Sequence, residues 1–383
     1  MHRSQSKFLS IFILSTAAAF VILTNQASRA AIETGPVEPL ASPISKLAST
    51  PGPHLIWQPL DFPVLPPPRI GFALTIDTGR QEALLFGGYN SAEGYLNDIW
   101  WTNGHQWTNF SGYSAPVGRF GASLVYDEER SETILYGGYY NSEFLGTTFT
   151  WVPYAWTQQF PHISPPPRVG ASMAYDAARK EAILFGGNYS VGKEYYLLND
   201  TWAWDGADWQ QLPPANSPPE RDRAQMVYDR ARQNIILFGG GSYAISLNDT
   251  WIWDGVDWIE QHPLHTPPRL VDFGMTYDES RQQVILWGGW ISPLTPDGRE
   301  TGTWAWDGQD WTQLETYREP PYELANSGRL VYLPTLKTTI LIGELHNHIC
   351  SSEGDCTSSN ETQVWALTSG YLSYFPAITS VKQ

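Results

Sequence analysis

LNDTWAWDGADW, at residues 198–209, returns almost unchanged as LNDTWIWDGVDW at residues 247–258. Three looser copies read LNDIWWTNGHQW (96–107), LGTTFTWVPYAW (145–156) and ETGTWAWDGQDW (300–311). The five copies begin 49, 53, 49 and 53 residues apart. A phrase that recurs at this spacing predicts a chain built from structural repeats of about 50 residues.

Two further phrases precede each copy in a constant order. The nearer one ends an apolar run with a glycine pair, at 87–88, 137–138, 186–187, 239–240 and 288–289. The farther one reads PPPRIGFALTID (66–77), PVGRFGASLVYD (116–127), PPPRVGASMAYD (165–176), PPERDRAQMVYD (218–229) and PPRLVDFGMTYD (267–278). A degenerate sixth unit keeps RLVYL (329–333), TILIG (339–343) and QVWAL (363–367).

This order of an apolar strand, a glycine pair, a tryptophan-bearing strand and a tryptophan after a short turn resembles the kelch-repeat family. The resemblance covers roughly residues 55–375. It implies a β-propeller of the galactose-oxidase-like kind, in which each repeat forms one four-stranded blade. We therefore expect an all-β, six-bladed kelch-type propeller with antiparallel blades.

The residues themselves are consistent with that fold. The first strands of units two and three, GASLVYD and GASMAYD, begin with small residues, which suits strands that converge on an axis. The second is almost wholly apolar, as expected of a strand covered on both faces. Trp202 and Trp204 alternate about Ala203 and share one strand face, which can fill the wedge between blades. Asp205-Gly206 predicts a tight hairpin turn after them.

We expect the propeller to span residues 55–376, with blades near 66–114, 115–163, 164–215, 216–265, 266–318 and 324–376. Two segments compete to complete the last blade. Residues 55–60 (LIWQPL) resemble the outer strand of other units, and residues 371–375 (YLSYF) could fill the same place. The residues leave this choice open.

The N-terminal segment predicts export. His2, Arg3 and Lys7 precede a mostly apolar run at 8–24, and small residues follow at 28 and 30. Residues 1–30 are therefore expected to be a signal peptide or, alternatively, an uncleaved anchor. Residues 31–54 are rich in Pro, Ala and Ser and predict a linker. The mature chain is then secreted or held in the cell envelope, with no other membrane span, and we expect a monomer.

Charge argues against one class of partner. The chain of 383 residues carries a formal net charge of −16 and no basic cluster. Such a chain repels phosphate backbones, so nucleic acid is not an expected partner.

One arginine recurs at the same position in five units: Arg69, Arg119, Arg168, Arg221 and Arg269. It lies near the loops that join successive blades and the loops between the second and third strands. The family resemblance implies that this face often carries ligand sites. The arginines could form a cationic collar that binds carboxylate or hydroxyl groups. Alternatively, each arginine braces its own loop or satisfies carbonyl groups of the next blade.

Departures from the repeat provide further candidates on this face. Unit four replaces the pattern R-x-G-A-S with RDRAQ, preceded by Glu220, and so carries Asp222 and Arg223, and unit five inserts a residue and carries Asp272 there. This charged set could bind a sugar or act on one; alternatively, it is a set of surface ion pairs that contribute little. The residues that follow the glycine pairs would ring the same opening and could stack on sugars or pack over the blades. They are Tyr89, Tyr139, Asn188 and Trp290.

Cofactor chemistry finds little support in the sequence. The two cysteines, Cys350 and Cys356, are expected to form a disulfide in an exported chain. With His346 and His348 they do not make a standard zinc spacing. Some kelch-like proteins are copper–radical oxidases with a Cys–Tyr link, but both cysteines here lie in the degenerate sixth unit. We therefore expect no metal and no cofactor.

Three functions are compatible with these observations. The first is an exported module that binds a protein or, as the first choice, a carbohydrate with one face of the propeller. The second is a carbohydrate-active enzyme such as a sugar isomerase or mutarotase, and the third is a structural envelope module. We expect binding without catalysis, because no recognisable catalytic constellation is present.

Overall fold

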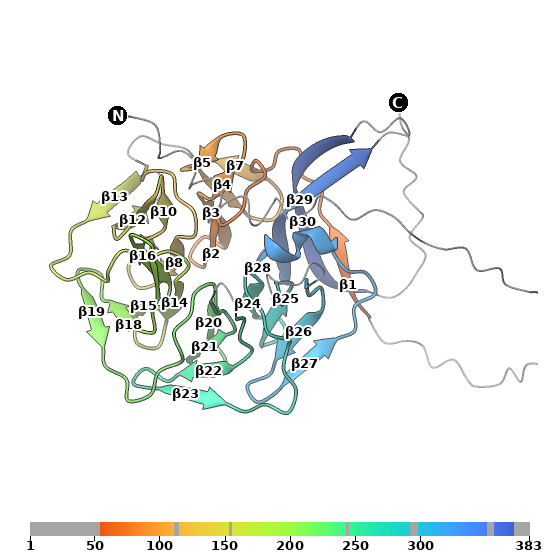
Figure 1. Cartoon of the computed structure of the whole chain (residues 1–383). Helices are drawn as coiled ribbons and strands as arrows, with labels where there is room; N and C mark the ends of the chain where they lie inside the picture. The colour runs from red at the N-terminus through yellow and green to blue at the C-terminus, as the bar shows by residue number, and fades with distance from the viewer. Residues whose placement is uncertain are drawn as a thin grey trace, which may run out of the picture. The chain divides into compact units, whose positions relative to one another are not determined.

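Six four-stranded antiparallel sheets follow one another along the chain and confirm the expected six-bladed β-propeller (Figure 1). The computed structural model describes residues 54–110, 115–152, 155–242, 245–291, 298–350 and 356–370. The expected signal peptide and nearly all of the expected linker lie outside these residues. In the first five blades the innermost strand is followed outward by the later strands of the same repeat, as the repeat order predicts, whereas the outermost strand of blade six is β1 (His54–Pro59).

The first three blades have regular strand bounds. Blade one consists of β2 (Ala73–Asp77), β3 (Glu82–Phe86), β6 (Ile99–Thr102) and β7 (Trp107–Asn109). Blade two consists of β8 (Ser123–Asp127), β9 (Glu132–Tyr136), β12 (Thr148–Val152) and β13 (Ala155–Gln159). Blade three consists of β14 (Ser172–Asp176), β15 (Glu181–Phe185), β18 (Thr201–Trp204) and β19 (Trp209–Leu212).

The other three blades continue the ring. Blade four consists of β20 (Gln225–Asp229), β21 (Asn234–Phe238), β22 (Thr250–Trp253) and β23 (Trp258–Gln261). Blade five consists of β24 (Gly274–Asp278), β25 (Gln283–Trp287), β26 (Thr303–Trp306) and β27 (Trp311–Leu314). Blade six consists of β28 (Arg329–Leu333), β29 (Thr338–Cys350), β30 (Cys356–Gly370) and β1 (His54–Pro59), and the short 3-10 helix η1 (Tyr322–Asn326) precedes it.

The N-terminal strand closes the ring. In Figure 1, β1 lies beside β30, and the register places Trp57 opposite Leu367. The Trp57 indole also donates to Thr303 of blade five over 2.9 Å. Residues 55–60 are therefore the segment that pairs with β30, and the alternative at 371–375 lies outside the described residues. Because β28 also contacts β2, the six inner strands form a continuous circle.

The repeated phrase links each blade to its neighbour through one tryptophan and one threonine. In four of the six blades the first tryptophan of the outer strand is buried and donates from its indole to the first threonine of the preceding blade's third strand. The pairs are Trp209–Thr148, Trp258–Thr201, Trp311–Thr250 and Trp57–Thr303, at 2.9–3.0 Å. Trp202 and Trp204 are buried against blade two, as the wedge argument predicts. The phrase is therefore a connector between blades as well as a hairpin.

The Asp-Gly turn of the phrase is a second connector. Arg130, Arg179 and Arg232 of the preceding blades each donate to its aspartate carbonyl, at Asp205, Asp254 and Asp307. Each arginine is held by a buried aspartate of its own blade; Arg179, for example, lies 2.8 Å from Asp176. Gly206 has φ 102°, and a Cβ there would collide with the Arg130 side chain. Glycine is therefore required both for the turn and for the approaching arginine.

Two junctions lack the threonine, and this yields a stability prediction. Blade one has Ile99 and blade six has Val364 at the threonine position, and the indoles of Trp156 and Trp107 have no hydrogen-bond partner among the described residues. Val364 and Trp107 lie in the same apolar cluster. Val364→Thr should supply the missing acceptor and raise the free energy of unfolding by about 1 kcal/mol. Urea denaturation measures this change.

The control for Val364→Thr is Val331→Thr, in the same apolar cluster but outside the repeat's threonine position. A buried hydroxyl without a designed partner should lower the free energy of unfolding by about 1–2 kcal/mol. Equal destabilisation by both substitutions would contradict the proposed role of the threonine.

Candidate functional site

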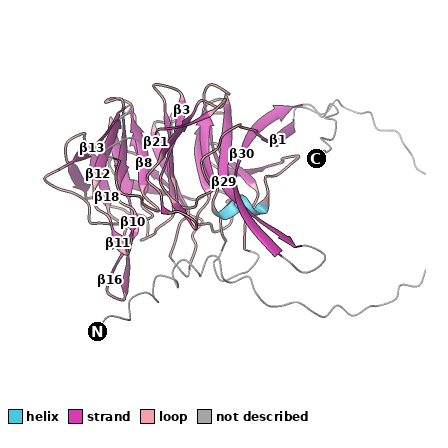
Figure 2. Ribbon diagram, turned by 90° about the horizontal axis from the view of Figure 1, so that it is seen from above, coloured by secondary structure: helices cyan, strands magenta, loops and turns pink. Residues whose placement is uncertain are grey.

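Three short β-ribbons extend the second and third strands of blades one to three on one face of the ring. They are β4–β5 (Tyr89–Asn90 and Gly94–Tyr95), β10–β11 (Tyr139–Tyr140 and Glu143–Phe144) and β16–β17 (Asn188–Val191 and Glu194–Leu197). Figure 2 shows β10, β11 and β16 projecting from the same side of the blades. We call this side the ribbon face.

Aromatic rings gather on the first two ribbons. The Tyr95 ring lies 5.2 Å from Tyr89, 6.2 Å from Tyr139 and 5.4 Å from Tyr140, measured between centroids. Tyr139 also contacts Phe144 at 5.2 Å. Burial, together with the neighbouring tyrosines, raises the pKa of Tyr95 to about 12, so its hydroxyl stays protonated at neutral pH. Tyr140 is the most exposed ring of this group and is free to meet a ligand.

The third ribbon presents a second aromatic surface and is fixed to blade four. Tyr189 and Tyr196 stack with centroids 5.1 Å apart and planes 18° apart. The Tyr195 hydroxyl donates to Asp222 over 2.8 Å, and the Asn188 side-chain amide donates to the same carboxylate over 2.6 Å. Burial and the Asp222 charge raise the pKa of Tyr195, which keeps this donor protonated. Asp222 therefore holds the ribbon in place.

The recurring arginines lie inside the blades in four of the five units. Arg69, Arg168 and Arg221 are buried, and each makes two bonds of 2.6–2.8 Å to the aspartate of its own phrase (Asp98, Asp200 and Asp249). Each also donates to the carbonyl of the first glycine of its pair at 2.9–3.0 Å. This geometry matches the alternative in which each arginine braces its own blade, and it leaves no exposed collar at these positions.

Arg119 and Arg269 depart from that pattern. Arg119 is also buried, but it meets the Thr147 hydroxyl at 3.2 Å where the other units have aspartate. Burial without a carboxylate lowers the pKa of Arg119 to about 10, and the group remains charged at neutral pH. Arg269 is exposed, because Leu270 occupies the equivalent backbone position and its carbonyl accepts from Gly240. The sequence alignment of Arg269 with the other four is therefore wrong by one residue.

A ring of left-handed residues surrounds the axis at the ribbon face. It comprises Gly71, Gly121, Gly170, Arg223 and Asp272, with φ between 54° and 68°. Successive backbone hydrogen bonds of 2.8–2.9 Å run from Gly121 to Gly71, from Gly170 to Gly121 and from Arg223 to Gly170. Blades one to three use glycine here, whereas blades four and five place charged side chains in the same conformation.

These charged residues form one connected group with Arg329 of blade six. Arg223 contacts Asp222 and Asp272, each at 3.1 Å, and donates to the Ser242 carbonyl at 3.2 Å. Arg329 donates to the Asp272 carbonyl at 3.4 Å, and its nearest distance to the Asp272 carboxylate is 3.9 Å. Burial lowers the pKa of Arg223, but Asp272 and Asp222 raise it by more. We call Asp222, Arg223, Asp272 and Arg329 the axial cluster.

The structure gathers only part of the set expected from the sequence. Asp222, Arg223 and Asp272 come together, whereas Glu220 is exposed and has no hydrogen bond or ion pair with them among the described residues. Trp290 is half-buried, and its backbone pairs with Val271. The register of β29 and β30 places Cys350 opposite Cys356, and the disulfide between them stays a prediction. In the described part of the chain, no three His, Cys, Asp or Glu residues are grouped to hold a metal ion.

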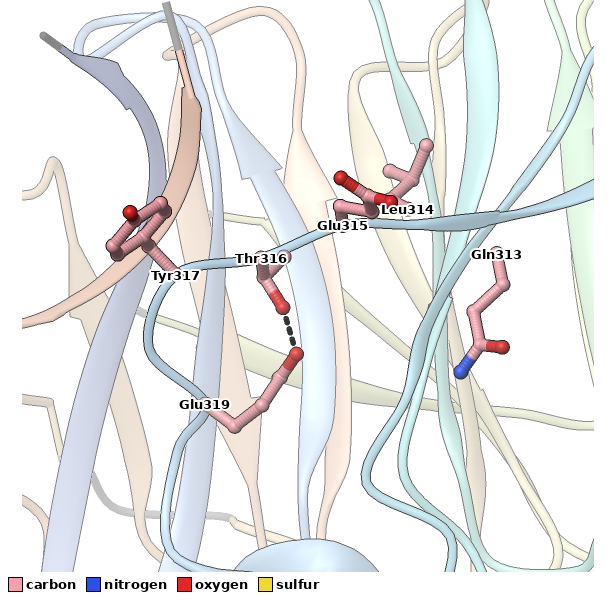
Figure 3. Close-up of a pocket in the computed structure, with 6 residues that line it drawn as sticks. All are labelled: Gln313, Leu314, Glu315, Thr316, Tyr317 and Glu319. Atoms are coloured by element: carbon pink, nitrogen blue, oxygen red, sulfur yellow. Dashed lines mark hydrogen bonds between the residues drawn. The ribbon is translucent and has the colours of Figure 1, made fainter. Parts of the chain in front are cut away.

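A pocket of about 620 Å³ lies beside the closing strand (Figure 3). It is lined by Gln313, Leu314, Glu315, Thr316, Tyr317 and Glu319. The Glu319 carboxylate accepts from the Thr316 hydroxyl and, at 3.3 Å, from the Trp287 indole. Burial is the main cause that raises the pKa of Glu319 to about 7. The same loop donates from the Tyr317 backbone to Leu55 over 2.9 Å, so the pocket belongs to the joint that closes the ring.

Sequence reasoning missed several residues of the ribbon face. Tyr95, Tyr140, Tyr195 and Tyr196 do not follow a glycine pair directly, and Arg329 lies in the degenerate sixth unit. The long insertion NYSVGKEYYL at residues 188–197 was a usable signal, because it exceeds the corresponding segment of unit four and carries three tyrosines. Nothing in the sequence around Arg329 marks it as a site residue, because it reads as one of the residues of a β-strand.

No helix among the described residues has the length and apolar character needed to cross a bilayer. Comparison of the chain with protein-family models and with curated proteins finds no match.

Proposed function

We propose that this chain is an exported, kelch-type β-propeller that binds a carbohydrate with its ribbon face and performs no chemistry on it. The observation that carries the proposal is the pairing of two surfaces on that face. Exposed tyrosine rings lie on the ribbons, and the partly exposed axial cluster lies beside the third ribbon. The kelch resemblance and the N-terminal segment support the family and the export, respectively.

Both surfaces suit sugars. Tyrosine combines a large apolar face with a hydroxyl, so it can cover the C–H face of a sugar ring at low conformational cost. Arginine and aspartate together offer donors and acceptors to hydroxyl groups. The tyrosines are held by ring contacts and by the bond from Tyr195 to Asp222, so the surface is largely formed before a ligand arrives.

The test is a glycan array followed by calorimetry on the ligand that binds best. The double variant Tyr140→Ala/Tyr196→Ala removes two exposed rings, and we expect the dissociation constant to rise by about 10- to 100-fold, because each contact contributes on the order of 1 kcal/mol. The control is Val256→Ala, 77% exposed in the β22–β23 turn at the opposite end of blade four. Unchanged affinity in the double variant would contradict the ribbon face as the site.

A further inference from the structure

Two of the four residues of the axial cluster lie in the left-handed region of backbone conformation. Arg223 has φ 54° and Asp272 has φ 57°, in positions where three other blades have glycine. The left-handed region is disfavoured for residues with a side chain, for arginine more than for aspartate. Both side chains are 28% exposed, so packing in a fully buried core does not explain why they adopt this conformation. Two such outliers in adjacent blades, in contact with each other, point to a role in function.

The charges of the axial cluster balance. Asp222 and Asp272 carry two negative charges, and Arg223 and Arg329 carry two positive charges, so the sum is zero. Asp222 is occupied by Asn188, Tyr195 and Arg223. A balanced group of this kind gives no general attraction for either an anion or a cation.

The space between Asp272 and Arg329 suits one kind of ligand group. Asp272 Oδ1 and Arg329 Nη2 are 3.9 Å apart, which is too far for a direct hydrogen bond. An oxygen atom placed about 2.8 Å from both would accept from the guanidinium and donate to the carboxylate. An alcohol does both, whereas a carboxylate cannot donate and an ammonium group cannot accept. Arg329 is 18% exposed, so a group from solvent can reach it.

We propose that the axial cluster binds a hydroxyl group of a neutral sugar between Asp272 and Arg329, and that it rejects the carboxylate of an acidic sugar. This proposal rests on the carbohydrate binding proposed above and specifies its ligand class. Arg223 acts as a positioning residue, because it holds the Oδ2 atom of Asp272 whereas Arg329 faces Oδ1. A uronate in the same place would face the Asp272 carboxylate without a proton to share.

The experiment uses an array of neutral oligosaccharides and their C6-oxidised counterparts, which keep the same linkages but carry carboxylates. The wild-type chain should bind the neutral member of its preferred pair at least tenfold more tightly. Arg329→Gln should weaken that binding at least tenfold. Asp272→Asn changes the cluster charge from zero to +1, so its affinity for the oxidised member should rise at least tenfold.

Glu220→Gln is the matched control, because it also removes one negative charge but alters an exposed residue outside the cluster. It should leave both affinities unchanged. The gain of uronate binding by Asp272→Asn cannot come from misfolding, and thermal melting of each variant confirms that it is folded. Equal wild-type binding of both members, or preference for the oxidised one, would overturn this proposal alone. Binding of neither member of any pair would overturn it together with the proposed function.

Discussion

Replacing Arg221 with alanine is expected to lower the free energy of unfolding by about 3–5 kcal/mol, the usual cost of removing one partner of a buried ion pair. Arg221 is 1% exposed and binds both oxygens of Asp249. Its loss leaves that carboxylate and the Gly239 carbonyl without their main donor. In the wild type burial raises the pKa of Asp249, but the bonds and charge of Arg221 together with the Trp251 bond lower it by more, so the variant loses the main group that offsets the burial of this carboxylate.

The matched control is Arg269→Ala, in the next blade. Arg269 shares the same motif in the sequence but is exposed, so Arg269→Ala should change the free energy of unfolding by less than about 0.5 kcal/mol. The loss of free energy of unfolding for Arg119→Ala should lie between those two values, because the partner of Arg119 is a threonine hydroxyl and no carboxylate loses its counter-charge. Chemical denaturation of the three variants measures their free energies of unfolding and so ranks the three losses. Equal losses for Arg221→Ala and Arg269→Ala would contradict the bracing role described here.

Trp57→Ala should lower the free energy of unfolding by about 3–5 kcal/mol, although Trp57 lies only a few residues inside the described part of the chain. Its side chain is fully buried between blades five and six, and its indole donates to Thr303. The repeat-equivalent Trp258 is also fully buried and donates to Thr201. The two tryptophans occupy the same structural position, so Trp258→Ala should lower the free energy of unfolding by a similar amount.

The comparison of Trp57→Ala with Trp258→Ala tests ring closure. Thermal and chemical denaturation should show one cooperative transition for each variant, shifted by a similar amount. A Trp57→Ala variant as stable as the wild type, beside a destabilised Trp258→Ala variant, would show that β1 does not close the ring in solution.

The blades were predictable because their signals are local. The alternation of Trp202 and Trp204, the Asp205-Gly206 turn and the apolar second strands each depend on neighbours within one repeat, and the structure confirms the strands that they predict. The position of Arg269 was not predictable in this way. Its place is decided by the bond from Gly240 to the Leu270 carbonyl, which depends on how blade five meets blade four.

The amino-acid sequence alone determined the repeat, the all-β class and the number of blades, because hydrophobic periodicity and turn residues act over a few positions. Only the tertiary structure decided that residues 55–60 close the ring and that four arginines are buried. It also decided that Arg329 joins Arg223 and Asp272 at the axis. These contacts join residues far apart in the chain, and their geometry is set by how whole blades pack, which no short stretch of sequence specifies.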